Sequence, residues 1–258
     1  MEHIAEILAR ETRKPLMNSG LPASPQSKDG DKFSIDNVCS VCKDAGIVHP
    51  IRSDGTVDYG TVMPCACRAE GIKKRRAERL FRYCQLPERT EDKTFATFED
   101  RDKKCAEAKK MARKLARGDS DVVFLTLLSN TGRGKSHLAI AICREWLKRG
   151  VPAKYAYVPE LLDDIRDSYQ KDELTGQSYS QLLDVLGTVP LLVLDDLGTE
   201  KKSEWATEKL QTIVDHRSRS ALPLVVTTNK PLAELANDDE GRISSRLQRE
   251  SWCRVVIF

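Results

Sequence analysis

The sequence predicts an α/β domain with a five-stranded parallel sheet that lies between helices. Apolar segments of strand length alternate with segments of helical periodicity from about residue 120 to residue 258. The strand-like segments are apolar throughout, which is typical of strands buried on both faces. Strands that alternate with helices favour a parallel sheet covered on both sides.

The elements of this domain are expected in the following order. The strands are predicted at 122–128, 153–158, 190–194, 222–227 and 252–258. The helices are predicted at 135–149, 159–169, 179–186, 203–218 and 240–249. Gly150 is expected to end the first of these helices, because a left-handed residue commonly stops a helix. Ser203 is expected to cap the N-terminus of the fourth.

The N-terminal part of the chain has a different organisation. Residues 1–13 are predicted as a short helix. Residues 14–36 are rich in Pro, Ser, Gly, Lys and Asp, so we expect a flexible linker without a core. A cysteine-containing module at 37–68 precedes a basic helix from about 69 to 85, which Leu86-Pro87 ends.

The charge and the distribution of apolar residues indicate which classes of protein are excluded. The formal net charge is only +3, and no apolar segment approaches the roughly 20 residues that span a bilayer. The first residues lack the features of a signal peptide, so we expect a cytoplasmic protein with no membrane partner. Residues 68–82 carry seven Lys or Arg against two Glu, and residues 101–117 carry eight against two acids. Either stretch is a solvated helix face or a nucleic-acid contact.

One glycine-containing segment predicts a phosphate site. Residues 129–136 read Ser-Asn-Thr-Gly-Arg-Gly-Lys-Ser and lie between a predicted strand and a predicted helix. Such a loop surrounds phosphates with backbone N–H groups, its lysine binds the β- and γ-phosphates, and its hydroxyl completes a Mg²⁺ shell. Ser129 replaces the usual first glycine, which is acceptable where φ stays negative. The expected nucleotide-binding residues are Asn130, Thr131, Gly132, Arg133, Gly134, Lys135, Ser136 and His137.

Acidic and polar residues end two further predicted strands. Asp195 and Asp196 follow the apolar run 190–194, at the edge where ligands bind in such sheets. We expect Asp195, together with Ser136, to hold Mg²⁺, and Asp196 to polarise the attacking water. Asn229 follows the strand 222–227 and is expected to contact the γ-phosphate or that water.

Four of the eight cysteines form two close pairs, Cys39 with Cys42 and Cys65 with Cys67. Because disulfides are rare in cytosolic proteins, we expect these thiolates to bind Zn²⁺, with free or redox-active thiols as the alternative. His49 lies between the pairs and is a possible substitute ligand. The remaining cysteines are expected to be small buried residues: Cys84, Cys105, Cys143 and Cys253.

Taken together, the motifs resemble a known family over residues 36–258. Their order resembles the DnaC/DnaI-type bacterial replicative helicase loaders, a branch of the AAA+ ATPases related to the IstB transposition helpers. The matching segments are Cys39-x-x-Cys42-x-Asp44-x-Gly46, Cys65-x-Cys67-Arg68, residues 86–89, 93–98, 131–139, 192–198, 204–206, 227–229 and 242–247.

The resemblance implies an AAA+ P-loop NTPase in residues 86–258 and a helicase-binding region in residues 1–85. It makes Lys135 and Ser136 the Walker A residues, Asp195 and Asp196 the Walker B residues, and Asn229 the sensor-1 residue. Arg246, or alternatively Arg242, becomes an arginine finger for the next subunit. Residues 86–98 are expected to pack on the adenine, and Arg166 and Tyr169 to bind single-stranded DNA. The chain stops at Phe258, so we expect the family's sensor-2 lid to be absent.

Three functions fit these features. The first is an ATP-dependent loader of a hexameric replicative helicase onto single-stranded DNA, with weak or partner-dependent hydrolysis and self-association through the ATP sites. The second is an ATPase helper of a transposase. The third is a zinc-containing adaptor for single-stranded DNA whose nucleotide site is structural.

Overall fold

The computed structural model describes residues 39–43, 45–119, 121–169, 179–201, 203–237 and 241–258. The predicted helix 1–13 and linker 14–36 lie outside these residues. The chain divides into two compact units, with the division between residues 76 and 77.

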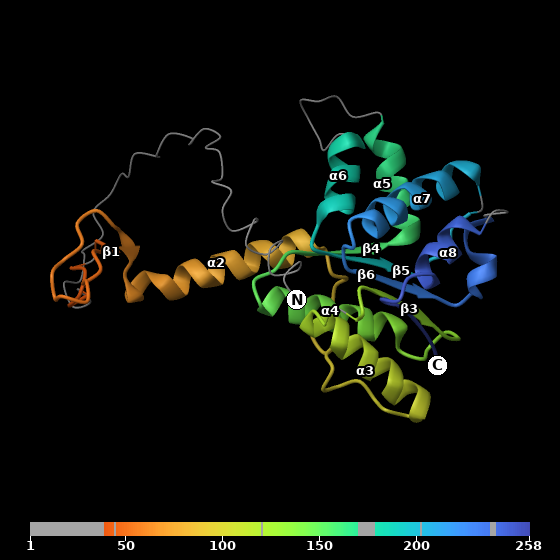
Figure 1. Ribbon diagram of the computed structural model, residues 1–258, viewed down its shortest axis with the longest axis horizontal. Coiled ribbons are helices and arrows are strands. Elements are labelled where there is room, and N and C mark those ends of the chain that lie inside the picture. Colours follow the sequence, from red (N-terminus) through yellow and green to blue (C-terminus); the bar gives the residue numbers. More distant parts are fainter. Residues whose placement is uncertain (1–38, 44, 120, 170–178, 202, 238–240) are drawn as a thin grey trace. The chain divides into compact units, whose positions relative to one another are not determined.

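The C-terminal unit is built on a parallel sheet with the strand order β4-β5-β6-β3-β7 (Figure 1). Because the strands are parallel, their carboxyl ends lie at one edge of the sheet, where Leu128 of β3 is opposite Thr228 of β6. The α/β class is confirmed, and each predicted strand is present with ends shifted by at most two residues. The strands are β3 (Phe124–Leu128), β4 (Ala153–Tyr157), β5 (Leu191–Asp195), β6 (Leu224–Thr228) and β7 (Cys253–Ile257).

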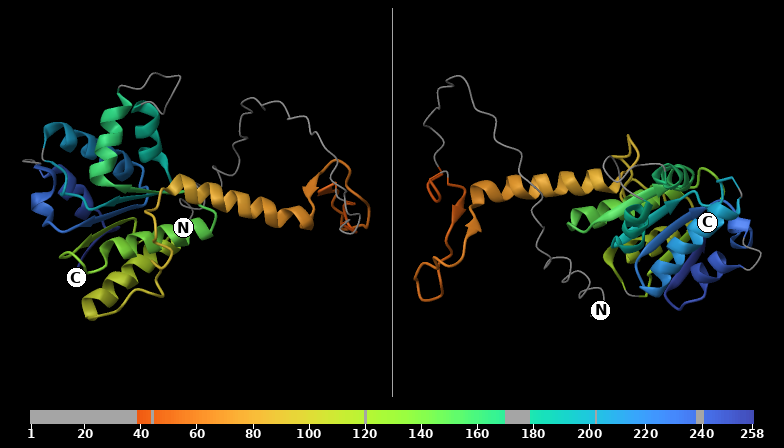
Figure 2. Two further views of the ribbon diagram at one scale, coloured as in Figure 1. Left: turned by 180° about the vertical axis from the view of Figure 1, so that it is seen from behind. Right: turned by 90° about the horizontal axis from the view of Figure 1, so that it is seen from above.

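Helices cover both faces of this sheet (Figures 1 and 2). One face packs against α3 (Lys103–Arg117) and α4 (Lys135–Lys148). The other face packs against α5 (Val158–Ser168), α6 (Tyr179–Thr188), α7 (Glu204–Arg219) and α8 (Arg242–Gln248). A short 3₁₀ helix, η2 (Leu232–Asn237), was not predicted.

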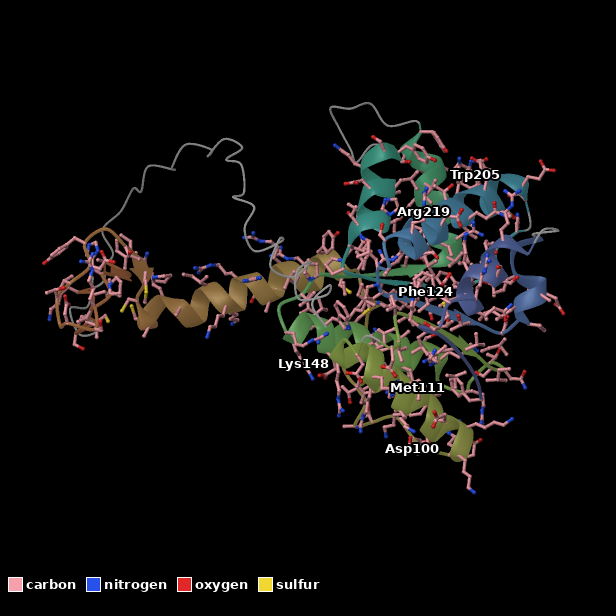
Figure 3. The ribbon with its side chains drawn as sticks, in the orientation of Figure 1. Asp100, Met111, Phe124, Lys148, Trp205 and Arg219 are labelled. Atoms are coloured by element: carbon pink, nitrogen blue, oxygen red, sulfur yellow. The ribbon has the colours of Figure 1, made fainter. Side chains whose placement is uncertain are left out.

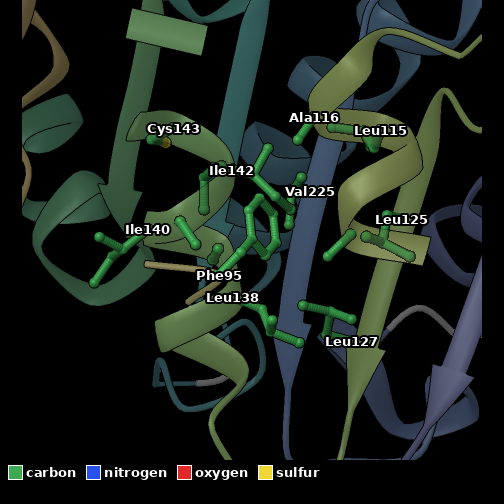
Figure 4. Packing of buried hydrophobic residues seen from close by; sticks show 14 of the residues in the cluster. Phe95, Leu115, Ala116, Leu125, Leu127, Leu138, Ile140, Ile142, Cys143 and Val225 are labelled. Atoms are coloured by element: carbon green, nitrogen blue, oxygen red, sulfur yellow. The ribbon is translucent and has the colours of Figure 1, made fainter. Parts of the chain in front are cut away.

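The core is divided by the sheet into two apolar clusters. Alternate strand residues point to opposite faces. Leu125 and Val225 pack with α3 and α4, whereas Phe124 and Val226 pack with α5, α6, α7 and α8. Figure 4 shows the first cluster, in which Phe95 fits between Leu138 and Val225.

Two predicted helix ends are confirmed. Gly150 has a left-handed φ of 73°, and its N–H donates to the carbonyl of Leu147 at the end of α4. The Ser203 hydroxyl accepts a hydrogen bond from the N–H of Ala206 at 3.1 Å and so caps α7.

The N-terminal unit contains a two-stranded antiparallel sheet, β1 (Ile47–Val48) and β2 (Met63–Pro64), and the start of α2 (Ala66–Cys84). This helix begins three residues before its predicted start, because the Cys65 carbonyl accepts from the N–H groups of Arg68 and Ala69. Cys67 therefore lies on the first helical turn. Among the described residues, no helix is both long and apolar enough to cross a membrane.

Candidate nucleotide-binding site

The loop 129–136 connects β3 to α4 with two left-handed glycines. Gly132 has a φ of 80° and Gly134 a φ of 98°. A Cβ atom on Gly134 would lie 2.6 Å from the Phe98 ring, so packing as well as backbone conformation requires glycine here. Ser129 keeps a negative φ and extends the sheet by donating its N–H to the Thr228 carbonyl at 3.2 Å. The serine therefore fits this position.

The Lys135 side chain is buried at the centre of the loop. Its Nζ donates to the carbonyl of Ser129 at 2.8 Å and to that of Asn130 at 3.1 Å. Burial lowers the pKa of Lys135, and the nearby Asp196 and Asp195 partly oppose this shift. The ammonium group thus lies within the electrostatic reach of both aspartates.

Asp195 is buried at the end of β5 and has a donor on each carboxylate oxygen. Thr227 Oγ1 donates to Oδ1 at 2.6 Å, and the Tyr155 hydroxyl donates to Oδ2 at 2.5 Å. Burial, followed by the charge of Asp195, raises the pKa of Tyr155 well above its usual value, so this hydroxyl stays a donor. The same Thr227 oxygen accepts from the N–H of Asp196 at 2.8 Å. One threonine therefore fixes both aspartates.

Asp196 adopts a left-handed φ of 62°, an uncommon conformation for a residue other than glycine. Backbone strain of this kind clusters at functional sites. The turn that follows is held by Thr199, whose hydroxyl donates to the Asp196 carbonyl at 2.8 Å.

Residues 94–102, which precede α3, hold the loop 129–136 in place. Arg133 forms an ion pair with Asp102 Oδ2, while Asp102 Oδ1 caps α3 by accepting from the N–H of Cys105 at 2.8 Å. Arg133 and this cap lower the pKa of Asp102 to about 2. His137 Nε2 lies 2.8 Å from the Thr94 carbonyl, so the loop and the start of α4 are both held by residues 94–102.

Neither Asn229 nor Arg246 forms a hydrogen bond or an ion pair with Asp195 or Asp196 among the described residues. Asn229 is exposed just after β6, and its amide makes no hydrogen bond with any residue that the structure describes. Arg246 on α8 forms an ion pair with Asp215 of α7 and donates to the Arg242 carbonyl at 3.0 Å. The remaining expected phosphate-binding residues, Thr131, Gly132 and Ser136, are exposed or half-buried on the loop.

Arg166 and Tyr169 lie on and just after α5, on the face of the sheet opposite α4. Arg166 pairs with Asp163 at 2.9 Å, and its guanidinium lies 5.0 Å from the Trp205 ring. Tyr169 is half exposed and stacks on Tyr179 with 4.4 Å between ring centroids.

The four cysteines of the N-terminal unit form a cluster that fits a tetrahedral metal. Their sulfur atoms all lie within 4.8 Å of one another, and the Sγ atoms of Cys39 and Cys65 are 3.8 Å apart. Four sulfurs around Zn²⁺ at about 2.3 Å are about 3.8 Å apart. The N–H groups of Cys42 and Val41 lower the pKa of Cys39 to about 6, which favours its thiolate.

His49 is not part of this cluster. Its Nδ1 bonds the Thr61 carbonyl at 2.8 Å, and the group of potential ligands found among the described residues consists of the four cysteines. The prediction that the other cysteines are buried is confirmed: Cys84, Cys105, Cys143 and Cys253.

Three residues that position the site were not predicted from the sequence. Thr227 lies in the segment 227–229, in which a role was predicted for Asn229 alone. Tyr155 reaches Asp195 from the neighbouring strand β4, and no local sequence signal marks it. Asp102 precedes a basic helix, and its N-cap position was the available signal.

The fold and the geometry of the loop 129–136 are those of a P-loop nucleotide-binding domain. The chain belongs to the family of IstB-like ATP binding proteins, whose family model matches residues 66–257. The predicted resemblance to the DnaC, DnaI and IstB branch is therefore confirmed.

Named relatives and solved structures agree with this family. The replicative helicase loader DnaC of Escherichia coli K12 is 32% identical over 130 residues, 50% of this chain and 52% of DnaC. The replicative helicase loader DnaI of Bacillus subtilis 168 is 29% identical over 106 residues, 41% of this chain and 32% of DnaI. The chain thus spans about half the length, or less, of these relatives. A crystal structure of the DnaC helicase loader shares the fold, with a TM-score of 0.57 and 21% identity over 67% of this chain and 99% of that chain.

Proposed function

We propose that this protein is an ATP-dependent loader that places a hexameric replicative DNA helicase on single-stranded DNA. The observation that carries the proposal is the convergence of Lys135, Asp195 and Asp196 at one sheet edge. The similarity to DnaC and DnaI, which are helicase loaders, supports the same function.

In this proposal the loop residues 130–137 bind the phosphates of ATP, with Lys135 on the β- and γ-phosphates. Ser136 and Asp195 hold Mg²⁺, which neutralises charge on the phosphates. Asp196 orients and polarises the attacking water, and Asn229 contacts that water or the γ-phosphate. Arg246 leaves the Asp215 pair to reach the site of the next subunit, which couples hydrolysis to self-association.

The partner contacts follow from the same proposal. Residues 1–85, with Zn²⁺ bound by the four clustered cysteines, bind the helicase, and residues 86–258 form the ATPase domain. Arg166 and Tyr169 contact single-stranded DNA. The protein acts in the cytoplasm, where the helicase works.

The proposal is tested by mixing the full chain with its cognate helicase and ATP. We expect a stable complex in size-exclusion chromatography and DNA-stimulated ATP hydrolysis. D196N should abolish turnover while the complex persists. A wild-type chain that forms no complex with the helicase contradicts the loader function.

The family match also favours a second candidate, an ATPase helper of a transposase. That function predicts DNA-bound rings or filaments in ATP without any helicase. Electron microscopy of the chain with ATP and duplex DNA distinguishes the two candidates.

A further inference from the structure

Three arginines lie together where α3 and α4 end. Arg113 and Arg117 occupy successive turns of α3 and therefore the same side of that helix. Arg149 follows α4 and donates its Nη1 to the Arg117 carbonyl at 3.0 Å. All three side chains are exposed. Figure 3 marks Lys148 and Met111 on these two helices, on the side of the sheet away from Trp205.

Four lysines near the arginine cluster pair with carboxylates, whereas the arginines have no carboxylate in direct contact among the residues described. The lysines pair with nearby carboxylates at 2.8–3.7 Å: Lys109 with Asp100, Lys110 with Glu107, Lys114 with Asp121 and Lys148 with Glu145. Within the described part of the chain, none of the three arginines has a carboxylate within 4.0 Å. Two helix C-termini supply about one negative charge in total, and Glu145, which pairs with Lys148, also acts on Arg149 through its charge. Three guanidinium charges exceed this compensation, so the cluster keeps a net positive charge.

Aromatic rings hold two of these guanidinium groups in place. Arg113 lies 5.7 Å from the Phe95 ring centroid and Arg149 lies 4.9 Å from that of Trp146. An arginine stacked on a ring keeps its N–H edge available for two hydrogen bonds to one phosphate. Grooves of about 710 Å³ and 440 Å³ are both lined by Arg113 and Arg117.

We propose that this arginine cluster (Arg113, Arg117 and Arg149) binds the phosphodiester backbone of a nucleic acid. A protein partner is disfavoured, because no large apolar side chain of α3 or α4 is exposed to form the apolar core of a protein interface. The cluster lies across the sheet from Arg166 and Tyr169, so it is a second nucleic-acid surface. Nucleic-acid binding by the arginine cluster extends the proposed function but does not require ATP hydrolysis.

The test compares two double variants of the full chain with equal loss of charge. R113Q/R117Q removes two unpaired charges, and K110Q/K148Q removes two carboxylate-paired charges from the same surface. Fluorescence anisotropy measures the affinity for labelled single-stranded and duplex oligonucleotides over a series of salt concentrations. The two oligonucleotides show which form of nucleic acid the cluster prefers.

We expect R113Q/R117Q to weaken binding about tenfold and to reduce the slope of log K against log salt by about 1.5, since each phosphate contact contributes about 0.7–0.9. K110Q/K148Q should change the affinity less than threefold. Equal losses in both variants, or no loss in R113Q/R117Q, would overturn the proposal. Competition by polyglutamate as strong as by unlabelled oligonucleotide at equal charge would also overturn it. Circular dichroism and ATP affinity serve as folding controls.

Discussion

At the scale of single residues, Thr227 is the side chain on which the aspartates depend most. Its hydroxyl holds the Asp195 carboxylate at 2.6 Å and the Asp196 N–H at 2.8 Å. We expect T227V to lower the turnover of ATP by about 10–100-fold with little change in ATP affinity, because small displacements of catalytic groups cost about that much. Steady-state kinetics and equilibrium nucleotide binding measure the two effects.

Thr126 provides a matched control for that substitution. It is fully buried in β3, and its hydroxyl has no hydrogen-bond partner among the described residues. T126V should therefore leave turnover unchanged and the protein equally or more stable. Loss of activity in T126V equal to that in T227V would mean that core packing, not the hydroxyl, is responsible.

The lowered pKa of Asp102 predicts that this residue contributes to stability in a pH-dependent way. Arg133 and the α3 cap lower its pKa to about 2, below the usual 3.8. The folded state then binds fewer protons than the unfolded state, so this contribution is complete above pH 3.8 and is lost as the pH falls toward 2. D102N keeps the helix cap and removes the charge.

Thermal melting of the wild type and D102N from pH 7 to pH 2 tests this prediction. The wild type should melt at the higher temperature at neutral pH, and the difference should disappear between about pH 4 and pH 2. A difference that stays constant over this range would show that the carboxylate charge of Asp102 does not stabilise the fold.

At the scale of elements, Arg217 links α7 to two other segments of the core, the end of α6 and the residues before β6. It is fully buried and donates to the carbonyls of Leu186, Val189 and Pro223 at 2.6–2.9 Å, and its burial lowers its pKa. R217A removes the donor from the buried carbonyls of Leu186 and Val189, whereas the Pro223 carbonyl keeps the N–H of Leu192 at 3.2 Å. We therefore expect the free energy of unfolding to fall by roughly 3–5 kcal/mol. Chemical denaturation measures it.

Arg219 is the control for this substitution, because it lies two residues later on the same helix and is exposed. R219A should change the free energy of unfolding by less than about 0.5 kcal/mol. Similar values for R217A and R219A would show that the buried guanidinium contributes nothing specific.

The helices and strands could be predicted from the sequence, but the side-chain contacts between them could not. Short apolar segments located the five strands, and the local patterns at Gly150 and Ser203 located helix ends. The four clustered cysteines and the loop 129–136 were found because their ligand types recur at short spacing. Thr227 and Tyr155 could not be assigned this way, because their roles depend on β4, β5 and β6 being neighbours. Buried Arg217 gave no signal either, since arginine is usually exposed.

At the scale of the whole molecule, loss of the metal should unfold one unit and leave the other folded. If Zn²⁺ holds the cluster of Cys39, Cys42, Cys65 and Cys67, C39S should lose zinc and expose residues 39–68 to proteolysis. Residues 77–258 should remain folded, because their core contains none of these cysteines. Metal analysis and limited proteolysis measure both effects, and a wild-type protein purified without zinc would refute the assignment.

For the C-terminal unit as a whole, we propose that the loop 129–136 and the two aspartates together bind ATP with magnesium. Titration of the full chain with a fluorescent ATP analogue, with and without Mg²⁺, tests it most directly. We predict binding that Mg²⁺ strengthens in the wild type, binding at least about tenfold weaker in K135A, and loss of the Mg²⁺ effect in D195N. Absence of nucleotide binding in the wild type, or unchanged binding in K135A, would show that this loop is not the ATP site.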